Sequence, residues 1–185
     1  QDEYASAFGG LNLYKFTKNK VIVKPINLKK STAKELQDNS LLFRLGDREH
    51  SKGILQSQIK SINQSNKTTI LALHKAKELA IEMYDSLKEN DLTKFSDILN
   101  RGWEAKRDYT KGVSNKRIEM VSKKATENGA QALKVTGAGG GGHFFIYANP
   151  SKHNSIIKSL KKLGVNNVDF KYQNQGSRVF EINNL

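Results

Sequence analysis

The sequence has 185 residues, of which 37% are hydrophobic and 26% charged, which is enough apolar material for a folded core. No apolar run approaches the roughly 20 residues that a membrane-spanning helix needs, and the absence of cysteine excludes disulfides, a thiolate zinc site and a cysteine nucleophile. The net charge of +13 fits nucleic-acid binding, a basic surface around an anion site, or an acidic companion segment outside this sequence; we favour the anion site.

The first part of the chain predicts a turn, a hairpin and a strand. Ala7-Phe8-Gly9-Gly10 is typical of a helix end or a tight turn. The β-prone segments 11–16 and 20–24 are separated by a short polar gap, which favours a β-hairpin. A further strand is expected over residues 41–45, after a polar turn at residues 37–40.

Helical spacing of apolar residues extends from about residue 47 to residue 111. It predicts three amphipathic helices, the third capped by Asp91. Their apolar positions are Ile54, Leu55, Ile59 and Ile62; Leu73, Ala76, Ala80, Met83, Tyr84 and Leu87; and Leu92, Phe95, Leu99 and Trp103. One turn beyond Trp103 the same face reaches Lys106 and Arg107, which are either a solvated helix end or an anion contact.

The last third of the chain alternates helices and strands. Ser114 is a candidate N-cap for a helix that stops at Asn128-Gly129. A pair of strands follows, and Asn149-Pro150 then begins another helix. Alternating apolar residues predict strands over 168–172 and 178–182.

This order of elements indicates an α+β protein with helices grouped on one face of a mainly antiparallel sheet. We predict that residues 41–185 form a ferredoxin-like domain with inserted helices, a two-layer α/β sandwich. Residues 1–40 would be the tail of a separate, preceding domain. Because the chain begins at Gln1 without a methionine, we expect that upstream sequence is missing.

A glycine-rich loop lies between the strands expected at residues 132–135 and 144–148. Five of the six residues from Gly137 to Gly142 are glycine. Glycine permits positive φ and close approach of backbone to a ligand, so the loop indicates an anion site; a flexible hairpin loop without a ligand is the alternative. Its G-x-G-x-x-G letters do not indicate a dinucleotide site, because a strand follows and the next acidic residue is Asp169.

Residues 134–142 resemble the third conserved motif of the GHMP kinases, a superfamily that includes galactokinase, homoserine kinase and mevalonate kinase. Residues 1–10 resemble the Gln-Asp-x-Tyr-Ala-x-Ala-Phe-Gly-Gly stretch of its D-glycero-D-manno-heptose 7-phosphate kinase branch. Two further segments, 103–107 and 114–118, also resemble that branch. The second motif of the superfamily, a Ser-rich loop that cradles the ATP phosphates, is absent from the sequence. Leu45 also replaces the threonine of the branch's Thr-Gly-x-x-Arg pattern.

The resemblance implies a cytoplasmic sugar kinase that uses ATP and Mg²⁺ and phosphorylates the anomeric hydroxyl of a heptose 7-phosphate, for polysaccharide biosynthesis. Asp2 would orient or deprotonate that hydroxyl, and no metal ligand is assigned. Most contacts to ATP would come from the missing segment, so the fragment alone is expected to be inactive. The implied substrate- and phosphate-binding residues are Thr136, Gly137, Ala138, Gly139, Gly140, Gly141, Gly142, Lys106, Arg107, Arg48 and Arg178.

Two alternatives remain open at this stage. One is another sugar kinase of the superfamily, fucokinase- or galactokinase-like, whose acceptor carries no distal phosphate. The other is a basic nucleic-acid-binding α+β domain, which we disfavour because stacking aromatics are not interleaved with the basic residues. We expect no membrane partner, and a homodimer is compatible with the sequence. His143 and Tyr4 are expected to serve in strand packing and as a pocket wall.

Overall fold

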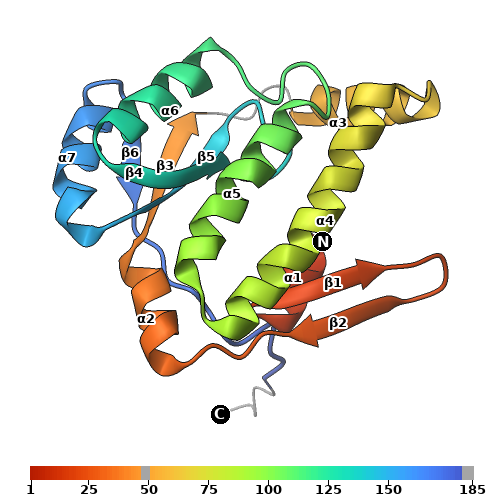
Figure 1. Cartoon of the computed structure of the whole chain (residues 1–185), viewed down its shortest axis with the longest axis horizontal. Helices are drawn as coiled ribbons and strands as arrows, with labels where there is room; N and C mark the ends of the chain where they lie inside the picture. Colours follow the sequence, from red (N-terminus) through yellow and green to blue (C-terminus); the bar gives the residue numbers. More distant parts are fainter. Residues whose placement is uncertain (47–50, 181–185) are drawn as a thin grey trace, which may run out of the picture.

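The computed structural model describes residues 1–46 and 51–180, which form helices and antiparallel sheets (Figure 1). The elements are α1 (Asp2–Phe8), β1 (Asn12–Phe16), β2 (Val21–Pro25), α2 (Lys30–Asp38), β3 (Ser40–Gly46), α3 (Ser51–Asn63), α4 (Lys67–Glu89), α5 (Leu92–Arg107), α6 (Lys116–Glu127), β4 (Ala130–Val135), β5 (Gly142–Ala148), α7 (Pro150–Lys161) and β6 (Asn166–Val168). The α+β class is as predicted. In the described part, no helix combines the length and apolarity that crossing a membrane requires.

A four-stranded antiparallel sheet holds the main core. Its strand order is β4-β5-β3-β6, which with the intervening helices is the βαββαβ arrangement of a ferredoxin-like fold. Residues that alternate along the strands, such as Phe43, Phe144 and Ile146, are fully buried against apolar residues of α6 and α7. Because side chains alternate between the faces of a strand, the intervening residues lie on the opposite face of the sheet.

The inserted helices α4 and α5 lie side by side and α5 also contacts β4 (Figure 1). The predicted apolar face of α5 is confirmed, because all four of its residues from Leu92 to Trp103 are buried. Asp91 caps this helix as expected, with its side chain accepting a hydrogen bond from the Lys94 N–H at 2.9 Å. On α4, by contrast, Ala80 is exposed while the neighbouring Leu79 is buried, so that part of the predicted face was misplaced.

Three local predictions were wrong. The polar turn at residues 37–40 is instead the end of α2 and the start of β3, because Leu36 packs into the core and holds the segment helical. Ser114 does not cap α6; Asn115 does, and the Ser114 hydroxyl binds Glu119 instead. On α3 the residues expected to be buried are largely exposed: Leu55, Ile59 and Ile62 are 51%, 57% and 40% exposed, and only Ile54 is buried.

The C-terminal segment departs most from the predicted strands. Strand β6 ends at Val168, and residues 169–180 have no regular secondary structure; residues 181–182 of the expected last strand lie outside the described residues. The backbone here bonds to α1 and its C-cap region rather than to a sheet: Gly10 N–H donates to the Gln173 carbonyl at 2.8 Å and Ser177 N–H to the Ser6 carbonyl at 3.1 Å. These hydrogen bonds satisfy backbone N–H and C=O groups that would otherwise pair with a neighbouring strand.

Close backbone contact between this segment and α1 depends on Gly176. A Cβ atom at Gly176 would lie 1.9 Å from the Ala7 carbonyl oxygen, so no other residue fits there without displacing backbone. The end of the chain therefore holds α1 in place against the rest of the fold.

The β1–β2 hairpin and α1 share an aromatic cluster. Tyr4, Phe8, Tyr14 and Phe16 have ring centroids 5.4–6.5 Å apart, distances typical of interacting aromatic pairs. Phe8 and Phe16 are nevertheless each 52% exposed, so the cluster is only partly covered. A two-stranded hairpin is marginally stable by itself, and here α1 and α4 support it.

Candidate functional site

The glycine loop connects β4 to β5 and begins with a pair of hydrogen bonds. Thr136 donates to the His143 carbonyl through both its N–H, at 2.9 Å, and its hydroxyl, at 3.2 Å. Residues 137–141 therefore form a closed hairpin loop rather than a helix start, which agrees with the rejection of a dinucleotide motif.

The loop packs tightly against the segment before α6. Gly140 N–H donates to the Val113 carbonyl at 2.9 Å, and the Asn115 amide donates to the Gly140 carbonyl at 3.1 Å. Gly139 has a φ of 105°, and a Cβ atom there would lie 2.7 Å from the Val113 carbonyl oxygen. Glycine is thus required for both conformation and space, and the loop is ordered by contacts with the fold.

Asn115 also places the N-terminus of α6 beside the loop. Its side-chain oxygen accepts a hydrogen bond from the Ile118 N–H at 3.0 Å, the usual geometry of an N-cap. The N-terminus of a helix carries partial positive charge and free N–H groups, so it favours an anion nearby. One amide side chain therefore fixes both the helix start and the loop.

A hollow of about 380 Å³ opens at this junction. It is lined by Leu45, Gly46, Asn115, Arg117, Ile118, Gly140 and Gly141. The Arg117 guanidinium is held at its edge by hydrogen bonds to the carbonyls of Leu45, at 3.2 Å, and Leu163, at 3.4 Å. The N-terminus of α6 and the Arg117 guanidinium, next to the glycine loop, form an arrangement suited to a phosphate group.

Lys106 lies at the other side of the loop. Its ammonium donates to the carbonyls of Val135, at 3.2 Å, and of Gly137. Hydrogen bonds from a charged donor contribute about 1.5–3 kcal/mol each, so Lys106 stabilises the first turn of the loop. The structure therefore brings Lys106 to the glycine loop, where it donates hydrogen bonds to two carbonyl groups.

The other predicted cations lie elsewhere. Arg107 forms an ion pair with Glu119 at 2.8 Å, and the Ser114 hydroxyl donates to the same carboxylate at 2.5 Å. Arg178 is exposed and follows Ser177, which is bonded to α1. Arg48 lies outside the described residues.

Asp2 is the first residue of α1, and its side chain is exposed. At the other end of this helix, Gly9 has a φ of 64° and packs closely against the backbone of Gln175. Across the described residues, no hydrogen bond or ion pair joins α1 to the glycine loop. The role predicted for Asp2 therefore remains a prediction.

Sequence reasoning gave Arg117 no role in lining the hollow, although segment 114–118, which contains this residue, was identified as a motif. It also gave no role to Lys134, a half-buried residue of β4 whose pKa is lowered by burial. The signal for Lys134 was a single cation within an apolar strand pattern beside the glycines.

Residues 83–166 match the family model described as the C-terminal domain of GHMP kinases. Over 183 residues the chain is 33% identical to D-glycero-α-D-manno-heptose 7-phosphate kinase of Campylobacter jejuni; the match covers 98% of this chain and 53% of that protein. The crystal structure of a proposed sugar kinase from Campylobacter jejuni has a TM-score of 0.67 and 30% identity, covering 95% of this chain and 49% of that one.

A D-glycero-D-manno-heptose 1-phosphate kinase from Bacteroides thetaiotaomicron gives a TM-score of 0.64 at 25% identity, with 96% of this chain and 48% of that one covered. The chain thus spans about half the length of each of these relatives.

Proposed function

Because this chain carries the C-terminal domain of the GHMP kinases, we propose that it works as part of an ATP- and Mg²⁺-dependent sugar kinase. The acceptor is D-glycero-D-manno-heptose 7-phosphate and the product is the 1,7-bisphosphate. The observation that supports this most is the glycine loop, which meets the N-terminus of α6 and Arg117 around one hollow. Similarity to a heptose 7-phosphate kinase over nearly all of the chain supports the choice of acceptor.

In the proposed reaction the anomeric oxygen of the sugar attacks the γ-phosphorus of ATP. The bond from the γ-phosphorus to the β,γ-bridging oxygen breaks, ADP leaves, and the hydroxyl proton passes to the Asp2 carboxylate. Such reactions depend mainly on positioning and electrostatic stabilisation, which backbone N–H groups and a guanidinium can supply. Bound Mg²⁺ would neutralise phosphate charge; the described residues contain no cluster of metal-ligating side chains, so we assign it no ligand here.

We further propose that residues 1–40 are the tail of a preceding domain and that the ATP-phosphate loop lies outside these 185 residues. The partly exposed aromatic cluster around Phe8 and Phe16 supports this, because large exposed aromatics often mark a contact surface. The 185-residue chain alone is then expected to show no turnover.

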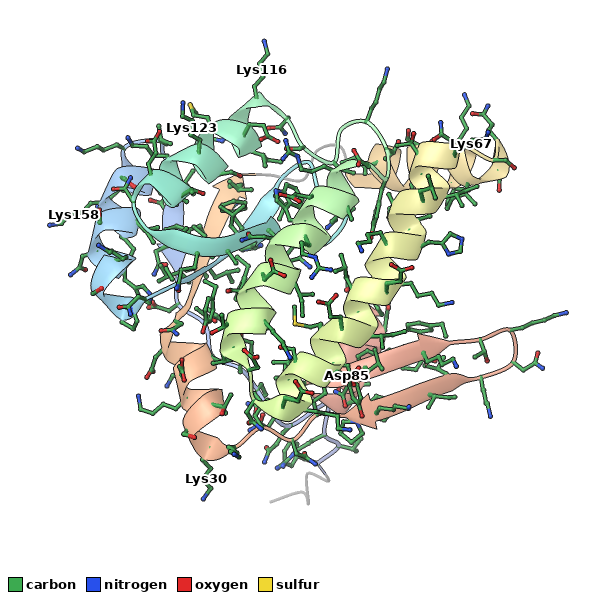
Figure 2. The ribbon with its side chains drawn as sticks, viewed as in Figure 1. Lys30, Lys67, Asp85, Lys116, Lys123 and Lys158 are labelled. Atoms are coloured by element: carbon green, nitrogen blue, oxygen red, sulfur yellow. The ribbon has the colours of Figure 1, made fainter. Side chains whose placement is uncertain are left out.

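The test uses the natural protein encoded by the reading frame that contains this sequence. ADP release is measured with heptose 7-phosphate as acceptor, for the wild type, Asp2→Asn and Asp85→Asn. Loss of a general base lowers kcat by about 10²- to 10⁴-fold, which we expect for Asp2→Asn. Asp85 is an exposed residue of α4 (Figure 2), and its variant should match the wild type.

Each other outcome has a separate meaning. Unchanged turnover in Asp2→Asn would remove Asp2 from the mechanism. Turnover with fucose or galactose but not with a heptose phosphate would identify a different sugar kinase. Salt-sensitive binding of single-stranded nucleic acid without any kinase activity would favour the binding-domain alternative.

A further inference from the structure

The segment that connects α5 to α6 holds the glycine loop through two of its residues. The Val113 carbonyl accepts a hydrogen bond from the Gly140 N–H at 2.9 Å, and the Asn115 amide donates to the Gly140 carbonyl at 3.1 Å. Both backbone polar groups of Gly140 are therefore bonded to this segment. The loop cannot shift relative to residues 113–115 without weakening at least one of the two hydrogen bonds.

The connecting segment is itself fixed by the end of α5 and by α6. The Ser114 hydroxyl donates to the Glu119 carboxylate at 2.5 Å, and Arg107 at the end of α5 forms an ion pair with the same carboxylate at 2.8 Å. A continuous series of polar contacts therefore runs from the end of α5 to residues 113–115. Arg107, which the sequence suggested as a phosphate contact, thus stabilises the segment that holds the loop.

Asn115 connects two sides of the hollow of about 380 Å³ through different atoms of one side chain. Its oxygen accepts a hydrogen bond from the Ile118 N–H at 3.0 Å and so caps α6, while its nitrogen donates to the Gly140 carbonyl. Serine and aspartate cap helices about as well as asparagine, but neither has the amide N–H group that donates to Gly140. Substitution can therefore remove the loop contact while the helix cap is kept.

We propose that Asn115 is a positioning residue for phosphoryl transfer, because it fixes the spacing between the glycine loop and the N-terminus of α6. This rests on the proposed function and adds the residue that sets the geometry of the site. Electrostatic stabilisation of a transferred phosphoryl group requires donors that are held in place before the reaction, and small displacements of such groups lower the rate strongly. Asn115 acts through the loop and needs no contact with the substrates.

The test compares Asn115→Ser with Asn149→Ser and the wild type in the natural protein. Asn149 is the matched control: it caps α7 by accepting a hydrogen bond from the Ser151 N–H at 3.0 Å, and within the described residues its amide nitrogen donates no hydrogen bond. Asn149 follows the last residue of β5, whereas the glycine loop precedes the first. The control therefore makes the same change at a helix cap without touching the loop.

Hydrogen exchange at the Gly140 amide reports how firmly the loop is held. We expect exchange about 2- to 12-fold faster in Asn115→Ser, the range that corresponds to the net contribution of one hydrogen bond. In Asn115→Asp a carboxylate would face the Gly140 carbonyl oxygen, so exchange should be faster still. Asn149→Ser should leave the rate unchanged, and both serine variants should keep the melting temperature of the wild type because their helix caps are retained.

The kinetic assay measures ADP release with ATP and heptose 7-phosphate. In Asn115→Ser, kcat should fall about 10-fold while KM changes little, the pattern expected when the lost interaction stabilises the transition state more than the bound substrates. Asn149→Ser should match the wild type in both constants. A merely structural role of Asn115 would lower the melting temperature and leave kcat of the folded enzyme unchanged.

Other results separate this proposal from the proposed function. If the wild type phosphorylates heptose 7-phosphate and Asn115→Ser has the same kcat or the same Gly140 exchange rate, the positioning role is wrong and the sugar kinase stands. An equal loss of kcat in Asn149→Ser would have the same meaning. If Gly140 exchanges faster in Asn115→Ser but the wild type phosphorylates no sugar, the contact between loop and helix stands, and the proposed function, with the catalytic role that rests on it, is wrong.

Discussion

Gly139→Ala should destabilise the protein by disturbing the junction between the glycine loop and the segment before α6. Two costs follow from the geometry. A side chain at a φ of 105° is strained by about 1–3 kcal/mol. The new Cβ atom would lie 2.7 Å from the Val113 carbonyl oxygen, which must move and thereby weaken its hydrogen bond from Gly140, a further loss of about 1 kcal/mol.

The expected total is about 2–4 kcal/mol, or a fall in Tm of roughly 4–16 °C for a protein of this size. Thermal unfolding followed by circular dichroism measures it. Gly102→Ala is the matched control: Gly102 lies inside α5 with open space around its Cβ position, so the same substitution should raise stability by up to about 1 kcal/mol. Equal melting temperatures for Gly139→Ala and the wild type would refute the proposed packing of the loop.

Two further predictions concern the C-terminal segment and Lys134. Gly176→Ala should displace residues 173–177 from α1, because its Cβ would overlap the Ala7 carbonyl; faster hydrogen exchange at the Gly10 and Ser177 amides would reveal it, and unchanged protection would contradict the contact. Burial lowers the pKa of Lys134 in the folded protein below its ordinary value of 10.5, so the unfolded chain binds more protons between those two values and stability from this group rises with pH across that window. The free energy of unfolding of the wild type, measured in urea from pH 7 to 10.5, should therefore rise relative to that of Lys134→Met as pH increases. A constant difference between the two proteins would argue against a desolvated ammonium.

Local sequence signals predicted most of the regular elements. The β-prone runs on either side of residues 17–19 formed the β1–β2 hairpin, and the spacing of apolar residues from Leu92 to Trp103 gave the buried face of α5. The order of elements also gave the α+β class. These predictions were right because periodicity reports which side chains leave water, and that signal is contained within one element.

The same signals failed where no other surface fully covers an element, and where a segment contacts a part of the fold that its own pattern does not predict. The apolar residues of α3 form a helix as predicted, yet Leu55 and Ile59 remain exposed, since a periodic pattern does not say whether another surface covers it. The alternation at Val168, Phe170 and Tyr172 suggested a strand, but the backbone there bonds to Gln37 and to the chain near α1.

Part of the candidate site could likewise be predicted from the sequence. The glycines identified the loop by themselves, because so many residues without side chains are costly to order unless the backbone must approach something closely. The sequence also placed Lys106 one turn beyond Trp103, and the structure brings it to the loop.

The amino-acid sequence alone determined that this chain has a glycine loop between two strands, an α+β core and an excess of positive charge. Tertiary structure alone decided what surrounds the loop: it placed Arg117 at the hollow, paired Arg107 with Glu119, and set Lys134 opposite Phe145 in the sheet. The physical reason is that the pattern along one strand fixes the spacing of its own side chains, whereas the register between strands depends on how distant segments pack.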